Sequence, residues 1–111
     1  MPSRDPNLYG RPRRRALAEC EDRYPYRCHL CGQPIDPTLD RVRHPLAWTA
    51  DELIPRRHGG SAYDVELMRP AHRCCNSARQ DRPLSDEVYA ACRRAYHRHA
   101  GAGTRQGSRQ W

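Results

Sequence analysis

Two closely spaced pairs of metal-binding residue types constrain this chain more than any other feature. Cys28 and Cys31 form a Cys-x2-Cys pattern. After residues 32–71, His72 and Cys75 repeat the same spacing. Two side chains at this spacing on one tight turn can reach the same ion, and two such pairs supply the four sulfur or nitrogen ligands of a closed tetrahedral Zn²⁺ site. We therefore expect a structural zinc site that joins segments distant in the sequence.

The chain is short of the apolar side chains that would otherwise stabilise a domain. It has 111 residues, of which 37% are hydrophobic, with ten prolines and no phenylalanine. This length fits one small domain, which buries only about two-thirds of the surface of its unfolded chain. Because metal affinity becomes folding free energy, a zinc site would supply stability that so small a core lacks.

A disulfide framework is the alternative explanation for the six cysteines. Disulfides are typical of secreted proteins, whereas residues 1–15 are polar and basic, and no apolar run approaches the roughly 18 to 20 residues of a membrane span. We therefore favour zinc ligation and a cytoplasmic protein without a membrane segment. Cys74 leaves the second thiol ligand ambiguous, although the matching spacing favours Cys75. Cys20 and Cys92 lie on apolar helix faces and are assigned to the core.

Hydrophobic periodicity and turn residues predict a small α+β domain. Before residue 80 the pattern predicts a helix over 13–22, strands over 47–54 and 65–68, and a helix over 70–79. A last helix begins after Ser85, which can cap it, and ends at Gly101. We expect residues 1–11 to form a disordered basic arm and residues 101–111 a disordered tail, so that the ordered domain spans 12–100.

The basic residues exceed the acidic ones and are all of one type. The chain has 20 arginines and no lysine against 13 acidic residues, which gives a formal charge of +7. Codon usage in a GC-rich genome explains the missing lysine, and the bidentate fit of guanidinium groups to phosphates is a functional reason for arginine. The charge balance itself favours a nucleic-acid partner over an acidic protein.

An acidic pair, two glycines and a His-x2-Cys-Asn motif follow one another after the first cysteine pair. The chain reads Asp51-Glu52-Leu53-Ile54-Pro55, then Gly59-Gly60, then Glu66-Leu67, then His72-Arg73-Cys74-Cys75-Asn76. In this order the motifs resemble the HNH endonuclease family, more narrowly its small members in bacteriophages and their bacterial hosts. The resemblance covers about residues 28 to 80, and the order of the motifs makes it specific where each alone would be weak.

The resemblance implies the ββα-metal (His-Me finger) fold, in which two strands and a helix hold one divalent cation and a zinc knuckle pins the ends, here with flanking helices. Asp51 and Asn76 match the ligands of this catalytic cation, Mg²⁺ or another divalent ion. Glu52 stands where the family has its general-base histidine, and Glu66 where it has the asparagine that braces the loop between the strands. The resemblance assigns the structural zinc to Cys28, Cys31, His72 and Cys75.

The departure at Glu52 leaves two ways of supplying a catalytic base. Glu52 can itself accept a proton from the attacking water, although a carboxylate is a weaker base than imidazole near neutral pH. Alternatively, Glu52 joins Asp51 as a cation ligand and His58, beside the two glycines, acts as the base. We expect His29 to point to solvent and His44 to serve loop structure. For Glu66, a bracing role and an inconsequential surface position remain equally open.

The implied activity is hydrolysis of phosphodiester bonds in double-stranded DNA, in a monomer that acts with phage terminase during genome packaging in the bacterial or phage-infected cell. A catalytically inactive, zinc-stabilised DNA-binding module is the main alternative, and a zinc-ribbon adaptor that binds protein is a third. Six arginines flank the motifs and are expected to contact phosphates on either side of the cut, unless they form only a solvated basic surface. They are Arg56, Arg57, Arg69, Arg73, Arg79 and Arg82.

Overall fold

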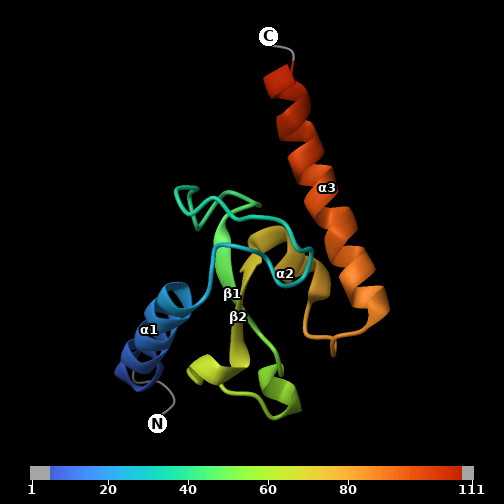
Figure 1. Ribbon diagram of the computed structural model, residues 1–111. Coiled ribbons are helices and arrows are strands. Elements are labelled where there is room, and N and C mark those ends of the chain that lie inside the picture. The colour runs from blue at the N-terminus through green and yellow to red at the C-terminus, as the bar shows by residue number, and fades with distance from the viewer. Residues whose placement is uncertain (1–5, 109–111) are drawn as a thin grey trace.

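The computed structural model describes residues 6–108, and it has a small α+β architecture. Its helices and strands are, in chain order, α1 (Pro6–Arg23), β1 (Trp48–Glu52), β2 (Met68–His72), α2 (Arg73–Arg79) and α3 (Asp86–Ser108). Two short 3-10 turns, η2 (Arg56–His58) and η3 (Val65–Leu67), lie in the connection between the strands. Figure 1 shows α1 on one side of the sheet and α2 with α3 on the other, and α3 extends past the remaining elements.

The two strands pair antiparallel and lead directly into a helix. Trp48 lies opposite His72 at one end of the ladder, and Glu52 lies opposite Met68 at the other. Because α2 begins at the residue after β2, the last residue of the strand and the first turn of the helix are adjacent in space. The order β1, β2, α2 thus brings Asp51, near the end of β1, to the same side of the domain as Asn76 of α2.

Several element boundaries differ from those expected. Residues 6–11, expected as a disordered arm, form the first turns of α1, and α3 runs past Gly101 to Ser108. Glycine costs only about 1 kcal/mol in a helix interior, so it does not have to end a helix. Pro70 belongs to β2, opposite Ala50, because its extended backbone fits a strand that needs no N–H donor at that position. Residues 1–5 and 109–111 of the expected arm and tail lie outside the described residues.

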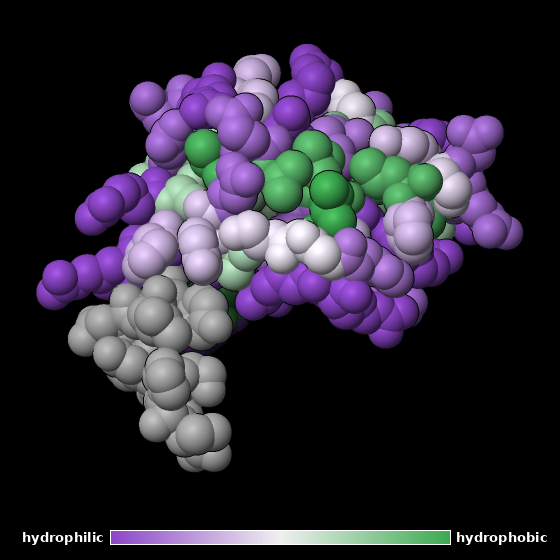
Figure 2. Space-filling model, turned by 90° about the horizontal axis from the view of Figure 1, so that it is seen from below, coloured by the Kyte–Doolittle hydropathy of each residue, from purple (hydrophilic) through white to green (hydrophobic). Residues whose placement is uncertain are grey.

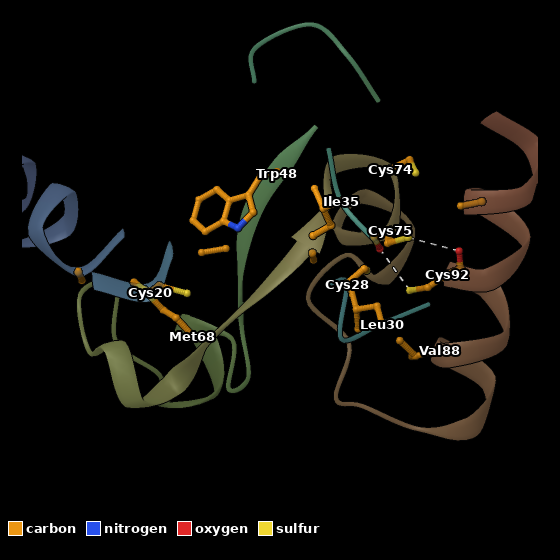
Figure 3. Packing of buried hydrophobic residues seen from close by; sticks show 14 residues of the cluster. Cys20, Cys28, Leu30, Ile35, Trp48, Met68, Cys74, Cys75, Val88 and Cys92 are labelled. Atoms are coloured by element: carbon orange, nitrogen blue, oxygen red, sulfur yellow. Dashed lines mark hydrogen bonds between the residues drawn. The ribbon is translucent and has the colours of Figure 1, made fainter. Parts of the chain in front are cut away.

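Cysteines contribute much of the core that holds these elements together (Figure 3). Cys20 on α1 and Cys92 on α3 are fully buried, which confirms their assignment to the core. The thiol of Cys92 donates a hydrogen bond to the carbonyl oxygen of Cys75 at 3.2 Å, and this contact joins α2 to α3. The largest apolar members of the core are Leu30, Ile35, Trp48, Met68 and Val88.

Side chains beyond the core fix the ends of the helices. Ser85 caps α3 as expected, since its hydroxyl oxygen accepts a hydrogen bond from the backbone N–H of Val88 at 3.2 Å. At the C-terminal end of α1, Glu21 is ion-paired with Arg41, whose guanidinium lies 4.9 Å from the centre of the Trp48 ring. The Arg41 contacts connect the end of α1 to the loop before β1 and to Trp48 at the start of that strand.

The described part of the chain contains no helix long and apolar enough to cross a membrane. Hydrophilic residues dominate the face seen in Figure 2, with a band of hydrophobic residues across it.

Candidate metal centre and acidic cavity

Four side chains with metal-binding atoms come together where the loop after α1, the end of β2 and the first turn of α2 meet. Their ligand atoms all lie within 4.8 Å of one another. The cluster contains Cys75 and not Cys74, which settles the ambiguity in the sequence. Its members are Cys28, Cys31, His72 and Cys75, the set expected from the two spaced pairs.

The spacing within this Cys3His cluster suits a tetrahedral metal site. Nδ1 of His72 lies 3.3 Å from Sγ of Cys31 and 3.8 Å from Sγ of Cys75. With bonds of about 2.0 Å to nitrogen and 2.3 Å to sulfur, tetrahedral angles place a nitrogen ligand about 3.5 Å from a sulfur ligand and two sulfurs about 3.8 Å apart, close to these separations. The cluster could therefore hold a structural metal such as zinc.

A tight turn in the backbone brings the first two thiols together. The backbone N–H of Gly32 donates to the carbonyl oxygen of Cys28 at 2.8 Å, and the backbone N–H of Cys28 donates to the backbone carbonyl oxygen of Gln33 at 2.9 Å. Gly32 has a φ of 83°, a left-handed conformation that glycine adopts without steric cost. The glycine after the second cysteine is thus what lets the chain reverse and aim both sulfurs at one point.

Burial and hydrogen bonds shift the pKa values of the cluster residues strongly. Hydrogen bonds from Cys31 and Cys75 lower the pKa of the Cys28 thiol well below its ordinary value, despite burial. Burial alone would lower the pKa of His72, but hydrogen bonds to Cys28 and Cys31 outweigh it and raise that pKa to about 10. By contrast, burial raises the pKa of Cys92 to about 11, so that this thiol stays protonated. A metal ion must therefore displace protons from the cluster when it binds.

The acidic pair and Asn76 line one cavity at the end of β1. The cavity has a volume of about 350 Å³, and Asp51, Glu52 and Asn76 contribute to its wall. Arg56 and Arg57 of η2 line the same cavity. The structure thus brings together the three residues that the resemblance matches to the family's active site, along with two of the six arginines.

Asp51 is held almost entirely inside the protein. Its side chain is 3% exposed, and its Oδ2 atom accepts a hydrogen bond from Nη1 of Arg79 at 2.6 Å. Nε2 of His29 lies 2.7 Å from the same oxygen. Two expectations are therefore wrong: His29 does not simply point to solvent, and Arg79, which is fully buried, is not available to a phosphate. A buried carboxylate requires such partners, because an unpaired charge is costly away from water.

Glu52 lies between two arginines at the mouth of the cavity. Its side chain is 15% exposed, with Oε2 at 3.2 Å from Nη1 of Arg13 and Oε1 at 3.4 Å from Nε of Arg56. Arg13 also donates to the carbonyl oxygen of Ala62 at 2.6 Å, so α1 reaches across to the loop between the strands. The carboxylate of Glu52 is thus partly neutralised and still borders the cavity.

The other two predicted residues lie away from the cavity wall. His58, the alternative base, is exposed at the end of η2 and does not line the cavity. Glu66 is exposed and ion-paired with Arg23 of α1 at 2.8 Å. The bracing contact in this loop comes instead from Asp64, whose carboxylate accepts a hydrogen bond from the backbone N–H of Glu66.

The remaining arginines of the predicted phosphate-binding set serve the protein itself. Arg82 donates to the carbonyl oxygens of Ala78 and Arg79, and so caps the end of α2. Arg69 stacks on the ring of Tyr24 at 4.8 Å. Arg73 lines a different hollow, beside Cys74 and α3. Only Arg56 and Arg57 of this set border the cavity, with side chains 62% and 68% exposed.

The contact made by His29 has no signal in the local sequence. It depends on the backbone N–H of His29 donating to the carbonyl oxygen of Pro70 at 3.0 Å, a pairing between segments far apart in the chain. Only the packing of the loop that carries Cys28 and Cys31 (the knuckle loop) against β2 reveals the contact between His29 and Asp51.

The chain matches no protein-family model, no curated protein and no solved structure. Fold and site together define a small α+β protein with a Cys3His cluster that could hold a structural metal, next to a cavity lined by acidic and basic side chains.

Proposed function

We propose that this chain is a metal-dependent endonuclease of the HNH type, which hydrolyses phosphodiester bonds of double-stranded DNA on a zinc-stabilised ββα-metal fold. The observation that supports it most is that Asp51, Glu52 and Asn76 line one cavity, at the junction of two consecutive strands and the helix that follows. Three polar residues spread over 26 positions converge there, beside a cluster suited to zinc.

The proposal gives each cavity residue a chemical task. The side-chain oxygens of Asp51 and Asn76 would hold a divalent cation, since hard cations such as Mg²⁺ prefer oxygen ligands. Such a cation, when bound, stabilises the negative charge that builds on the phosphate and the leaving oxygen. Glu52 accepts the proton of the attacking water. Both contacts to Asp51 fall on Oδ2, and among the described residues none falls on Oδ1.

The exposed arginines of η2 have a role in binding the substrate. Arg56 and Arg57 reach the cavity from the loop with exposed guanidinium groups, which would contact DNA phosphates and position the strand. The guanidinium group of Arg56 already forms an ion pair with Glu52, and a phosphate would compete with Glu52 for this group. Release of this contact would free Oε1 of Glu52 when substrate arrives, while Oε2 stays paired with Arg13.

An inactive DNA-binding module is the second candidate, and one observation favours it. The Asp51 carboxylate is only 3% exposed and is ion-paired with a fully buried arginine, Arg79, as in a purely structural contact. In that case the cavity would bind DNA through its arginines and lack chemistry. Action with phage terminase, and a bacterial or phage-infected cell as the setting, stay part of the proposal through the family resemblance alone.

Plasmid cleavage separates the two candidates. Purified protein is incubated with supercoiled DNA and Mg²⁺, Mn²⁺ or Ni²⁺, and compared with Glu52→Gln, Asn76→Ala and the control Glu66→Gln, which alters an exposed glutamate outside the cavity. We expect cleavage by the wild type and the control, at least a 100-fold loss in Glu52→Gln, the scale on which general bases contribute, and a loss of cleavage in Asn76→Ala, which removes an oxygen ligand of the cation. Salt-sensitive DNA binding without cleavage supports the module. Equal cleavage by all four proteins indicates a contaminant and overturns the nuclease.

A further inference from the structure

One oxygen of Asp51 is held by two donors that come from different parts of the chain. Arg79 belongs to the last turn of α2, and His29 belongs to the loop that carries the first cysteine pair. Their nitrogen atoms lie 2.6 and 2.7 Å from Oδ2. A carboxylate held through one oxygen by two fixed donors has little freedom to rotate, so the direction of Oδ1 is fixed as well.

Arg79 is immobilised by four hydrogen bonds that its guanidinium group donates. Besides Asp51, it donates through Nη1 to the carbonyl oxygen of Glu52 at 2.7 Å and through Nη2 to that of Leu53 at 2.9 Å. Its Nε donates to Arg82 at 2.9 Å. The residue is fully buried, and these bonds tie the end of α2 to the end of β1. The planar fork of arginine, with its fixed donor directions, is suited to such a bridge.

His29 is fixed from the opposite side by the metal-binding loop. It stands between two residues of the Cys3His cluster, Cys28 and Cys31, and its backbone pairs with β2. Its ring nitrogen donates to Asp51, because a carboxylate oxygen offers only lone pairs. Any shift of the loop around the two thiols would therefore move the ring that contacts Asp51.

We infer that His29 and Arg79 are positioning residues for Asp51, and that through them the geometry of the acidic cavity is coupled to metal occupancy of the Cys3His cluster. Both donors lie on segments that the cluster fixes: His29 is flanked by Cys28 and Cys31, and Arg79 follows Cys75 by four positions, one turn of the same helix. Metal in the cluster holds both segments, and they in turn hold Asp51. The part of this inference that concerns cation binding rests on the proposed function.

The coupling has to act in both directions, since a coupling free energy between two sites is reciprocal. If the loop fixes Asp51, then the contact with Asp51 also fixes the loop. Loss of the His29 side chain should therefore weaken zinc binding, and because affinity differences between related complexes lie mostly in the dissociation rate, zinc should leave the cluster faster, whether or not the cavity binds a cation. This second consequence does not depend on nuclease activity.

The test uses zinc-loaded full-length wild type, His29→Ala and His29→Gln, in which the glutamine amide nitrogen can replace Nε2. His97→Ala, at an exposed histidine of α3, is the matched control. Zinc per chain is measured first, then Mn²⁺ affinity from the electron paramagnetic resonance signal of free Mn²⁺, then the rate of zinc transfer to a chelator. We expect His29→Ala to weaken Mn²⁺ binding and speed zinc release by about 5- to 20-fold each, within the usual range of coupling. His29→Gln should restore both to within about twofold of the wild type, on the same scale.

The outcomes separate this inference from the proposed function. The coupling is overturned if His29→Ala has the same Mn²⁺ affinity and the same rate of zinc release as the wild type and His97→Ala, whatever the cleavage assay shows. Mn²⁺ binding that is the same in Asp51→Asn as in the wild type contradicts the proposed cation site. Faster zinc release in His29→Ala would still support the coupling in that case, and an unchanged rate would overturn it.

Discussion

Nε2 of His72 lies 3.0 Å from the carbonyl oxygen of Pro34, and this contact decides which ring nitrogen faces the three thiols. Because a carbonyl oxygen only accepts hydrogen bonds, Nε2 carries a proton and Nδ1 is the atom directed at Cys31 and Cys75. A histidine ligand commonly has its second nitrogen fixed in this way, which sets the ring orientation and its tautomer. The ring of His72 is thus already oriented with Nδ1 towards the thiols, and a metal ion has only to displace the Nδ1 proton.

The first prediction concerns the metal content of cysteine variants. We expect about one zinc per chain in protein never exposed to added metal, by elemental analysis, because the cluster offers four ligands to one ion. Cys75→Ser should lose the metal and the cooperative thermal transition. Cys74→Ser, a change at the neighbouring buried residue outside the cluster, should retain the metal. Loss of zinc in both variants, or in neither, would contradict the assignment of Cys75 as the ligand.

The second prediction concerns the pH dependence of metal binding. The pKa of His72 is raised to about 10 in the metal-free cluster, so the imidazole carries a proton at neutral pH that zinc has to displace. Zinc affinity should therefore rise as the pH increases towards 10, and fall by at least tenfold for each unit of acidification below neutrality, since one or more protons compete with the ion. Competition with a chelator of known affinity, measured from pH 6 to 9, gives the slope. An affinity independent of pH would contradict this prediction.

The third prediction compares two glycines. A Cβ added to Gly60 would lie 1.7 Å from the carbonyl oxygen of Ile54, closer than any real contact, whereas one added to Gly101 meets nothing within 4 Å. Gly60→Ala should therefore displace the loop between the strands and lower the free energy of unfolding by more than about 2 kcal/mol. Gly101→Ala, inside α3, should be neutral or raise it by up to about 1 kcal/mol. Chemical denaturation of both variants checks the pair, and equal stabilities would refute it.

The sequence predicts the metal cluster and the first strand well, because their signals are local, whereas the second strand, expected over 65–68, lies at Met68–His72. The two x2-spaced pairs name all four ligands, and β1 lies within the expected range 47–54. The helix ends are less predictable. Gly101 is a helix-breaking residue, and other helix breakers precede Arg13. The helices α3 and α1 continue through these residues despite the loss of stability, and no local sequence pattern shows how large a loss a helix tolerates.

The partners of Asp51 could not be predicted at all. Arg79 is 28 positions away and His29 is 22 positions away, and the sequence favours another role for each, one as a phosphate contact and the other as a solvent-facing loop residue. The pairing arises only when α2 and the knuckle loop pack against β1. For the same reason the sequence does not predict that Arg79 is inaccessible to a phosphate, since burial and hydrogen bonding are not visible in a sequence of charges.

The fourth prediction concerns acid stability at the end of α1. Hydrogen bonds from Arg41 and Tyr26 lower the pKa of Glu21 from 4.5 to about 2. A lowered carboxyl pKa stabilises the fold above the unfolded value, and this stabilisation is lost as the pH falls from about 4.5 towards 2. Glu21→Gln should thus be less stable than the wild type by about 1 kcal/mol at pH 7, allowing for solvent screening. The gap should close at low pH.

Paired denaturation curves from pH 7 to 2.5 measure this gap, and the difference between the two proteins cancels the effect of zinc loss that both share. Glu87→Gln, at an exposed glutamate in the first turn of α3, is the control and should show no comparable closing of the gap. A constant difference between wild type and Glu21→Gln at every pH would contradict the role given to the Arg41 contact.

The fifth prediction concerns the salt dependence of DNA binding. Removing one arginine that binds a phosphate lowers the slope of log affinity against log salt by about 0.9. Because Arg56 and Arg57 border the cavity with exposed side chains, Arg56→Ala with Arg57→Ala should lower the slope by nearly 2 and weaken binding equally for unrelated DNA sequences. Arg43→Ala with Arg27→Ala removes the same charge from exposed arginines outside the cavity wall. This control should leave the slope within about 0.5 of the wild type. Equal slopes for the two double variants would show that net charge, and not the cavity, attracts the DNA.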